Sequence, residues 1–285
     1  MFKLVRWAKM AMALVIIASL VLILPVSVAY AHVQPLGPLG TAADFAVLGA
    51  STVTNTGLTV VNGGHVGVSP GSAITGFGPG IVNSPGTIHF NDAAAQQAHT
   101  DAQTAYNNLA SAAVTQDLTG QDQGGLTLNP GVYHFSSSAQ LTGTLTLDAH
   151  NDPTSVFIFQ IGSTLTTASG SSVVVINAPA NWCSKYWQVG SAATLGTSTA
   201  FVGTIIAHDS ITMNTSASLY GRALALTAAV TLDTNAITVP VCSINAPPAP
   251  TPELPTVILL SVGLVGMGSY FVIRSKNQKR KLGNS

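Results

Sequence analysis

The sequence predicts a mainly β fold: a β-solenoid of triangular cross-section with one long α-helix packed alongside it. Three observations predict it. A four-residue phrase recurs along the chain, each repeat has room for two further strands, and one alanine-rich stretch contains neither Gly nor Pro. A fixed repeat of roughly twenty residues with β-type composition is typical of solenoids, in which each coil buries its apolar side chains against its neighbours.

The recurring phrase places Thr in its first position and Leu or Met in its second. Its four copies read Thr164-Leu165-Thr166-Thr167, Thr194-Leu195-Gly196-Thr197, Thr212-Met213-Asn214-Thr215 and Thr231-Leu232-Asp233-Thr234. The last two intervals are 18 and 19 residues, and the first, of 30 residues, leaves room for an inserted loop. Because side chains alternate along a strand, we expect the Leu and Met column to point inward and the first threonines to point outward.

Each repeat is expected to contain two more strands. The strand before the phrase covers Val156–Phe159, Tyr186–Val189, Thr204–Ala207 and Ala223–Leu226 in the four copies. The strand after the phrase has Phe201 and Leu219 as inward residues. Three strands in each coil give a triangular prism, whose apolar interior is buried only because neighbouring coils stack on one another.

One helix is predicted at about residues 92–114, with Asn91 as its N-cap, because alanine is the best helix former. Its apolar residues recur at helical spacing and form a narrow stripe: Ala98, Ala102, Ala105, Leu109 and Ala113. We expect this stripe to cover the outward residues Ile158, Ile206 and Ala225 of the solenoid. The helix would then shield that flank from water and from edge pairing.

The N-terminal segment, residues 1–31, reads as a secretory signal peptide. It has a basic start, the apolar run Ala11–Val28 and the cleavage pattern Ala29-Tyr30-Ala31. An uncleaved N-terminal anchor is the alternative, because the apolar run is long. Export permits disulfides, so Cys183 and Cys242 are expected either to bridge the inserted loop to the end of the domain or to be two free thiols.

The C-terminal segment predicts a transmembrane helix. A Pro-rich spacer at residues 246–256 follows the domain at 32–245, and the uncharged run at 257–273 has 17 residues, the short limit for a span. The basic tail at 274–285 is expected in the cytoplasm. The domain would therefore be extracellular, anchored to the cell membrane or surface by its C-terminus. Glu253-Leu254-Pro255-Thr256 resembles the signals of sortase-type transpeptidases but lacks their Thr-Gly ending, so covalent transfer to the wall is the alternative.

Composition excludes a nucleic-acid partner. Nine aspartates lie from Asp44 to Asp233 and face only Lys185 and Arg222, a net charge near −7 that would be repelled by a phosphate backbone. No cofactor or metal site is predicted either, because the histidines are scattered without metal-ligand spacing: His65, His89, His99, His134 and His208.

The strongest candidate for catalysis is the segment Asp148-Ala149-His150-Asn151-Asp152, since solenoid enzymes that act on polysaccharides use clustered acids. The run Asn151-Asp152-Pro153 reads equally as a turn. No arrangement of a nucleophile with a base and no phosphate-binding loop accompanies it. We therefore predict no catalytic residue and expect the protein not to be an enzyme.

Several long phrases resemble the bacterial and fungal ice-binding protein family. They are Phe45-Ala46-Val47-Leu48-Gly49, Val66-Gly67-Val68-Ser69-Pro70-Gly71, Leu128-Asn129-Pro130-Gly131-Val132-Tyr133, residues 156–165, and Gly221-Arg222-Ala223-Leu224. The resemblance runs from Leu39 to Val239. It implies a right-handed discontinuous β-solenoid with a long flanking helix, in which the first segment packs next to the last coil. It also implies binding to ice crystals, or to the ordered water at their surface, through a flat face.

The candidate ice-contact residues are the outward threonines Thr164, Thr166, Thr194, Thr212 and Thr231. A threonine presents a methyl and a hydroxyl on a stiff rotamer, so a regular array can hold ordered water. A flat surface suits a crystal better than a small molecule, which needs a concave pocket. The alternative is purely structural, because Thr favours strands and stacked Thr pairs stabilise sheets. The neighbouring column, expected as Thr166, Gly196, Asn214 and Asp233, is neither uniform nor uncharged.

Two functions from different classes follow. The first is a non-catalytic, surface-anchored ice-binding protein that acts through the Thr-rich face in ice adhesion, recrystallisation inhibition or antifreeze activity. The second is a cell-surface structural or adhesive module that serves as a rigid stalk or holds glycans and has no affinity for ice. Thermal hysteresis and ice-crystal morphology, measured with the purified domain, separate the two.

Overall fold

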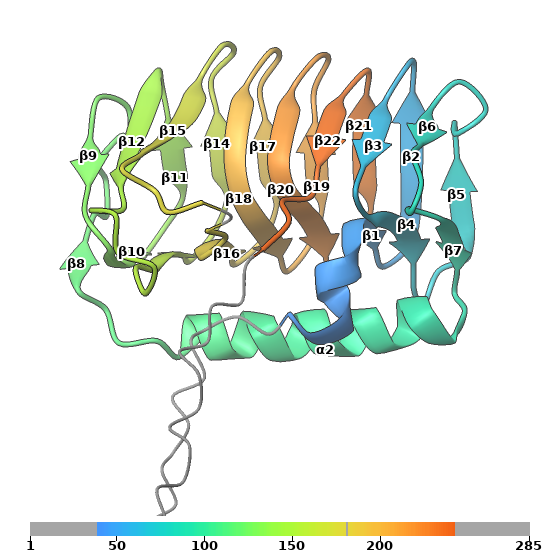
Figure 1. Cartoon of the computed structure of the whole chain (residues 1–285), viewed down its shortest axis with the longest axis horizontal. Helices are drawn as coiled ribbons and strands as arrows, with labels where there is room; N and C mark the ends of the chain where they lie inside the picture. The colour runs from blue at the N-terminus through green and yellow to red at the C-terminus, as the bar shows by residue number, and fades with distance from the viewer. Residues whose placement is uncertain (1–38, 181, 243–285) are drawn as a thin grey trace, which may run out of the picture. The chain divides into compact units, whose positions relative to one another are not determined.

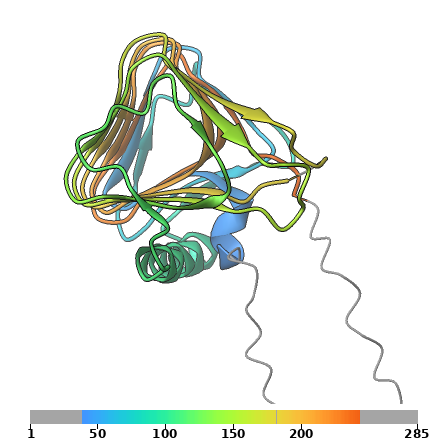
Figure 2. The same ribbon diagram turned by 90° about the vertical axis from the view of Figure 1, so that its left-hand side faces the viewer.

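The computed structural model describes residues 39–180 and 182–242, which form a β-solenoid with one α-helix beside it (Figure 1). Viewed along the stack of coils, the strands enclose a triangle, and the helix lies outside one of its sides (Figure 2). Neighbouring strands pair in parallel. The prediction of a mainly β solenoid with one flanking helix is confirmed.

The predicted signal peptide, spacer, membrane span and basic tail lie outside the described residues. Within residues 39–180 and 182–242, no helix combines the length and the apolar composition that crossing a membrane requires.

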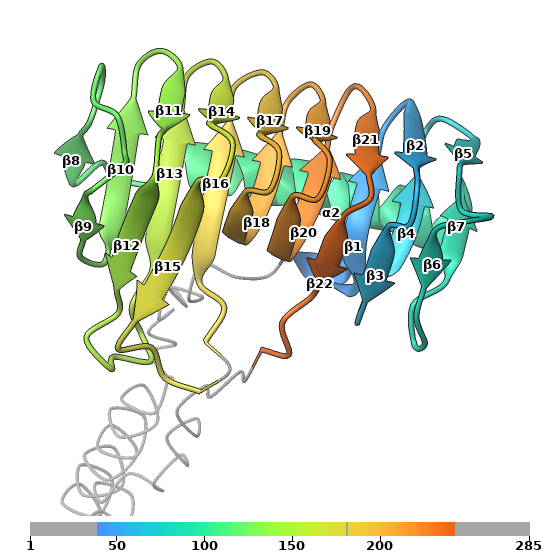
Figure 3. The ribbon, with the colours of Figure 1, turned by 90° about the horizontal axis from the view of Figure 1, so that it is seen from above.

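One side of the triangle is a sheet of seven short strands, which Figure 3 shows as a single row. In spatial order they are β11 (Ala139–Leu141), β14 (Leu165–Thr167), β17 (Ala193–Leu195), β19 (Ile211–Met213), β21 (Val230–Asp233), β2 (Thr52–Thr56) and β5 (Ala73–Thr75). We call the outer side of this sheet the threonine face.

The second side lies under the helix, and we call it the helix-covered face. Its strands are β8 (Gln116–Asp117), β10 (Gly131–Phe135), β13 (Phe157–Ile161), β16 (Lys185–Val189), the ends of β18 (Ala200–Ala207) and β20 (Ser218–Ala225), β1 (Phe45–Gly49), β4 (His65–Val68) and β7 (Ile88–Phe90). The strands β18 and β20 are long enough to bend around a corner, so their first residues belong to the third side.

The third side contains those first residues and shorter strands on either flank of them. These are β9 (Thr127–Leu128), β12 (Thr144–Asp148), β15 (Ser172–Ile176), β22 (Ala236–Thr238), β3 (Val60–Asn62) and β6 (Ile81–Val82). The sequence predicts one strand from Leu141 to Leu147. The chain instead ends β11 at Leu141, turns a corner through Gly143 at φ 90°, and starts β12.

The first segment of the chain stacks on the last coil, as the family resemblance implies. On the three sides β1 pairs with β20, β2 with β21, and β3 with β22. The solenoid is therefore discontinuous in sequence: the coils built by residues 45–90 continue a stack whose other coils come from residues after 115.

One apolar core fills the prism. The four predicted inward residues are buried, at most 1% exposed: Leu165, Leu195, Met213 and Leu232. Only the last three form one column, because Leu165 pairs with Ala193 and not with Leu195. Phe201 and Leu219 are buried as predicted. Across coils, the rings of Phe159 and Trp187 stack with centroids 3.8 Å apart.

The helix α2 spans Ala93–Ala110, preceded by a short 3₁₀ helix, η1, at Gly40–Asp44. Its N-cap is Asp92, whose carboxylate accepts from the Ala95 amide at 3.0 Å, so the prediction of Asn91 is wrong by one residue. The helix also ends earlier than the predicted residue 114. The amide of Thr115 already donates to Val132, and the chain must leave the helix to reach that strand.

The buried stripe of α2 packs on the helix-covered face, as predicted, and consists of Ala95, Ala98, Ala102, Ala105 and Leu109. The prediction of Ala113 as a member is wrong, because the helix has ended before this residue and its side chain is exposed. Ile158 and Ile206 lie beneath this cover and are at most 1% exposed. The prediction for Ala225 is wrong. Leu224, not Ala225, pairs with Ile206, and Ala225 belongs to the interior core.

Candidate functional site

The central outward residues of the threonine face are threonines on six consecutive strands. Their pairing registers join Thr166 to Thr194, then Thr212, Thr231, Thr54 and Thr75. We call these six residues the threonine ladder. Gln140 continues the row on the edge strand β11. All six threonines are exposed or half-buried, so their side chains are accessible to a ligand.

Thr164, a candidate from the sequence, is not in the ladder. The structure pairs Leu165 with Ala193 and Thr166 with Thr194, so the first copy of the phrase is shifted by two residues. Thr164 and Thr166 are two residues apart and both point outward, so strand alternation alone could not distinguish the two registers. Thr164 instead donates to the Ser138 hydroxyl at 2.8 Å, and Thr166 moves from the neighbouring column into the ladder.

Sequence reasoning missed Thr54 and Thr75. They lie on β2 and β5, which come from the first segment of the chain and extend the sheet beyond β21. The hydroxyls of Thr54 and Thr231 approach to 3.5 Å across this junction. A signal was present, because Thr52-Val53-Thr54 alternates as a strand and the family resemblance places the first segment beside the last coil.

Two rows flank the ladder, and they differ in composition. Two positions before the ladder threonines stand only Thr, Ala and Ser, which we call the small-residue row: Thr164, Ala192, Ser210, Ala229, Thr52 and Ala73. Two positions after the ladder threonines of β17, β19, β21 and β2 stands the polar row: Gly196, Asn214, Asp233 and Thr56. Gly196 and Asn214 are the first residues after β17 and β19. Neighbouring strands are about 4.8 Å apart and alternate residues on a strand about 6.6 Å, so the ladder and its flanks form a regular grid.

Among the residues of the seven strands, Asp233 is the one charged side chain. Its carboxylate accepts hydrogen bonds from the hydroxyls of Thr215 and Thr234, the latter at 3.1 Å. Both partners belong to the corner between the threonine face and the third side. The charge is therefore directed toward that corner and away from the ladder.

The candidate catalytic segment serves as a turn. Asp148 accepts from the amide of His150 at 2.9 Å and from the Asn177 side chain, and these bonds hold its pKa below the usual value. Asp152 is bonded by the hydroxyl and the amide of Thr154, which likewise lower its pKa. Carboxylates that accept local amides in this way stabilise the turn conformation of the chain.

Two of the scattered histidines meet at the end of the helix-covered face. The His65 and His89 rings lie edge to face with centroids 4.7 Å apart, and the Thr87 hydroxyl is 2.8 Å from a nitrogen of each. His89 contacts the helix-capping Asp92 at 2.8 Å. Burial, with the neighbouring His89, lowers the pKa of His65. Because the Thr87 amide also donates to His65, the arrangement ties β7 to β4 and to the start of α2 rather than presenting a nucleophile.

No group of three or more His, Cys, Asp or Glu side chains within residues 39–180 and 182–242 is placed to hold a metal ion. A shallow depression at the β8 end is lined by groups such as Tyr133, Asn129 and Gln116, and its lining contains no carboxylate, imidazole or thiol. The threonine face is therefore the regular, accessible arrangement on which a function can be argued.

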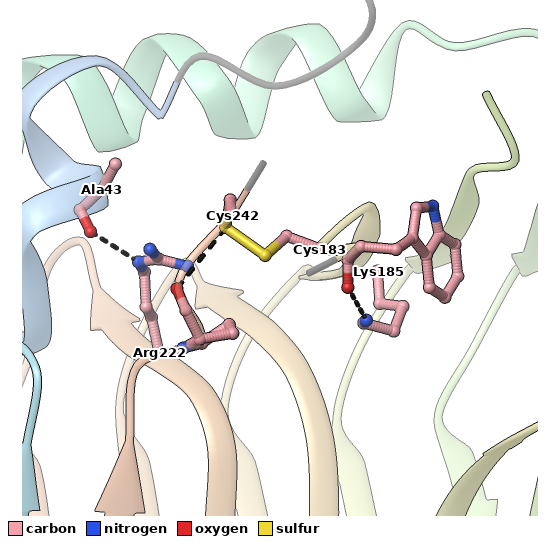
Figure 4. Close-up of a disulfide and its surroundings, with 7 residues drawn as sticks. Ala43, Cys183, Lys185, Arg222 and Cys242 are labelled. Carbon is pink, nitrogen blue, oxygen red and sulfur yellow. Dashed lines mark hydrogen bonds between the residues drawn. A yellow bond between two sulfur atoms is a disulfide. The ribbon is translucent and has the colours of Figure 1, made fainter. Parts of the chain in front are cut away.

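The structure joins Cys183 and Cys242 by a disulfide (Figure 4), the first of the two alternatives that the sequence left open. Two buried cations lie near this bridge. Arg222 donates from Nε to the Ala43 carbonyl of η1 at 2.8 Å, and Lys185 donates from Nζ to the Trp182 carbonyl at 2.7 Å. Burial lowers the pKa of Lys185 to about 8. Neither cation contributes to the threonine face.

The sequence matches a family model described as ice-binding-like over residues 47–238. An ice-binding protein from Nostoc sp. (strain HG1) is 57% identical over 208 residues, which cover 73% of this chain and 76% of that protein. Ice-binding protein 1 from Shewanella frigidimarina (strain NCIMB 400) is 36% identical over 236 residues, which cover 72% of this chain and 26% of that protein.

Solved structures agree with the sequence comparison. The crystal structure of an ice-binding protein from an Antarctic biological consortium has a TM-score of 0.67 at 48% identity, covering 71% of this chain and 90% of that chain. The ice-binding protein of the Antarctic ascomycete Antarctomyces psychrotrophicus has a TM-score of 0.67 at 40% identity, covering 71% and 98%.

Proposed function

Because this chain belongs to the ice-binding-like family, we propose that it binds ice through the threonine ladder and does so without catalysis. The family supports an ice-binding or antifreeze function. The observation that supports this particular surface is the register of six threonines on six consecutive strands, on a side of the solenoid that the helix leaves open.

A surface with a regular repeat suits a crystal, because both present their contact groups at repeated spacings. Each ladder threonine has a β-branched side chain with few rotamers, so little side-chain entropy is lost when the surface meets a crystal. On binding, the apolar area of the methyl group is removed from liquid water, and the hydroxyl can donate a hydrogen bond to lattice water and accept one from it. The underlying strands are pinned by the buried core, which keeps the hydroxyls at repeated spacings.

The place of action that we propose is the cell exterior. The signal-peptide pattern and the C-terminal apolar run with its basic flank support export and attachment at the C-terminus. The Cys183–Cys242 disulfide is consistent with an oxidising compartment. A protein held in this way would attach cells to ice, and a released form would shape crystals or inhibit recrystallisation. Fractionation of cells that express the full chain, and a variant truncated after residue 245, test the anchor directly.

The central experiment replaces Thr194 and Thr212 together by Tyr. Two bulky rings in the middle of the ladder would hold an ice surface away from the remaining threonines, so thermal hysteresis and recrystallisation inhibition should be lost. The matched control is Thr146→Tyr, an outward threonine on β12 of the third side, which should keep wild-type activity. Thermal unfolding of all proteins checks that the fold is intact.

Two results would contradict the proposal. If the Thr194 and Thr212 double variant remains folded and as active as the wild type, ice does not contact the ladder. If the purified wild-type domain neither shapes ice crystals nor gives thermal hysteresis, the protein is a structural or adhesive surface module without affinity for ice.

A further inference from the structure

We infer that ice contacts the threonine ladder together with the small-residue row, that the polar row stays in liquid water, and that Asp233 sets this boundary. The inference rests on the proposed function of the threonine face and adds to it the extent of the contact. It follows from a difference between the two sides of the ladder in shape, charge and hydrogen bonding.

The small-residue row carries side chains no larger than those of the ladder. Its members are Thr, Ala and Ser, so no side chain in it is larger than those of the ladder itself, and none is charged. Thr52 and Ala73 pair directly across β2 and β5. A flat crystal surface resting on the ladder can therefore continue over this row without a steric step.

The polar row is uneven and carries charge. Gly196, directly after β17, has no side chain, whereas Asn214 and Asp233 on the next two coils have longer polar side chains. Removing an ionised carboxylate from water is costly unless a partner replaces its hydration, and an ice lattice cannot rearrange to supply that shell. The liquid water around Asp233 therefore opposes the advance of ice over this row.

Hydrogen bonds hold the Asp233 side chain in its position at the edge of the threonine face. Its carboxylate accepts from the Thr215 hydroxyl of the preceding coil and from the Thr234 hydroxyl at 3.1 Å, and its amide donates to Asn235 Oδ1 at 2.7 Å. These contacts fix the charge at the edge between the threonine face and the third side. The boundary is thus built into the corner of the solenoid.

The opposite corner also carries a carboxylate, but that charge is directed elsewhere. Asp209 lies three residues before Thr212, with Ser210 between them on the face. Its carboxylate contacts His208 Nδ1 at 2.8 Å and the Thr227 hydroxyl at 3.2 Å, and the His208 ring lies 6.3 Å from that of Tyr106 on α2. Asp209 is therefore held toward the helix side, and it leaves the small-residue row uncharged.

The test uses two variants placed symmetrically about one ladder residue. Ser210→Tyr and Asn214→Tyr each put a ring two residues from Thr212, one in the small-residue row and one in the polar row. Both native side chains are half-buried and neither makes a side-chain hydrogen bond within the described residues. We expect Ser210→Tyr and the reference variant Thr212→Tyr both to abolish thermal hysteresis, and Asn214→Tyr to retain the wild-type value.

A second pair, Ser210→Lys and Asn214→Lys, repeats the comparison with a flexible side chain in case either ring prevents folding. Loss of activity in both members of a pair, with thermal unfolding unchanged, would mean that ice covers both rows and would overturn the inference while leaving the proposed function intact. Full activity of folded Thr212→Tyr would instead refute the proposed function.

The role of Asp233 has its own variant. Asp233→Asn keeps a side-chain oxygen for Thr215 or Thr234 and removes the charge, so the polar row becomes easier to dehydrate. We expect thermal hysteresis of this variant to rise above that of the wild type at equal concentration. If the Asp233→Asn variant is folded and its thermal hysteresis is equal to or below that of the wild type, Asp233 does not set the boundary.

Discussion

The threonine face and the helix-covered face are sides of the same prism, with the same inward core and different outward residues. On the helix-covered face the outward positions carry large apolar side chains such as Ile158, Ile206 and Leu224, and all three are at most 1% exposed. On the threonine face the ladder and the small-residue row carry Thr, Ser and Ala, and the ladder threonines remain accessible.

This difference indicates that one side of the solenoid serves packing and another is left open to a ligand. Stacking of the coils stabilises both sheets through the shared core, so the outward residues are free to specialise. The apolar outward rows pack against α2 and form a second buried layer. A row of threonines is polar enough to stay in contact with water, so it can remain open to a ligand. The following predictions test that contrast, from the largest expected effect to the smallest.

Truncation of a covered outward residue should cost far more stability than truncation of an open one. Ile206→Ala removes buried methyl and methylene groups between the sheet and α2, and we expect a loss of about 2–5 kcal/mol in the free energy of unfolding. Thr212→Ala on the threonine face should cost below about 1 kcal/mol, since the site is half-buried and makes no side-chain hydrogen bond within the described residues. Urea unfolding followed by circular dichroism measures both.

The contrast would fail if the two variants were equally destabilised. In that event the threonine face would contribute to stability through its outer side as much as the helix-covered face does. Ice-crystal shaping provides the complementary readout, because Ile206→Ala should retain activity at temperatures where it is folded.

Alkaline pH should stabilise the protein through Lys185, at the start of the strand β16. Burial lowers the pKa of this lysine from 10.5 to about 8. Above pH 8 the unfolded chain binds the proton more strongly than the folded one, so stability rises with pH until the unfolded lysine also loses its proton. Between pH 7.5 and 9.5 the gain should approach about 2 kcal/mol.

Lys185→Met is the control, because it removes the titrating group and keeps an apolar stem in the same place. As the pH rises, the unfolding free energy of the wild type should increase relative to that of this variant, which lacks the titrating amine. A difference that stays constant from pH 7.5 to 9.5 would mean that the lysine keeps its ordinary pKa in the fold.

Loss of the helix cap should give the smallest effect. Asp92→Ala removes the carboxylate that accepts from the Ala95 amide and contacts His89, and N-cap losses of this kind typically cost about 0.5–2 kcal/mol. Asp101→Ala on the same helix is a useful comparison, since its carboxylate instead accepts from the amide and the hydroxyl of Thr41 in the 3₁₀ helix η1. Thermal unfolding should show a lower melting temperature for Asp92→Ala and unchanged thermal hysteresis for the folded protein.

The sequence predicted the periodic parts of the molecule well and the joins between them poorly. The inward direction of Leu165, Leu195, Met213 and Leu232 was correct because alternation in a strand fixes which side chains face the core. The Thr164 register was wrong because a two-residue shift preserves that alternation. The N-cap was misplaced by one residue, since Asp92 caps the helix while the amide of Asn91 donates to Val68 of β4. The end of α2 was misplaced because the Thr115 amide donates to Val132, a partner outside the helix.

By itself, the sequence determined the repeat, the inward column, the single helix and the family, because these follow from local periodicity and from phrases that stand next to one another. Only the tertiary structure decided the membership of the threonine ladder. Thr54 and Thr75 join it because the first coils stack on the last, and Thr166 replaces Thr164 because β14 pairs with β17 through Leu165 with Ala193 and Thr166 with Thr194. Contacts between coils distant in sequence fix both, whereas strand alternation alone leaves the register open.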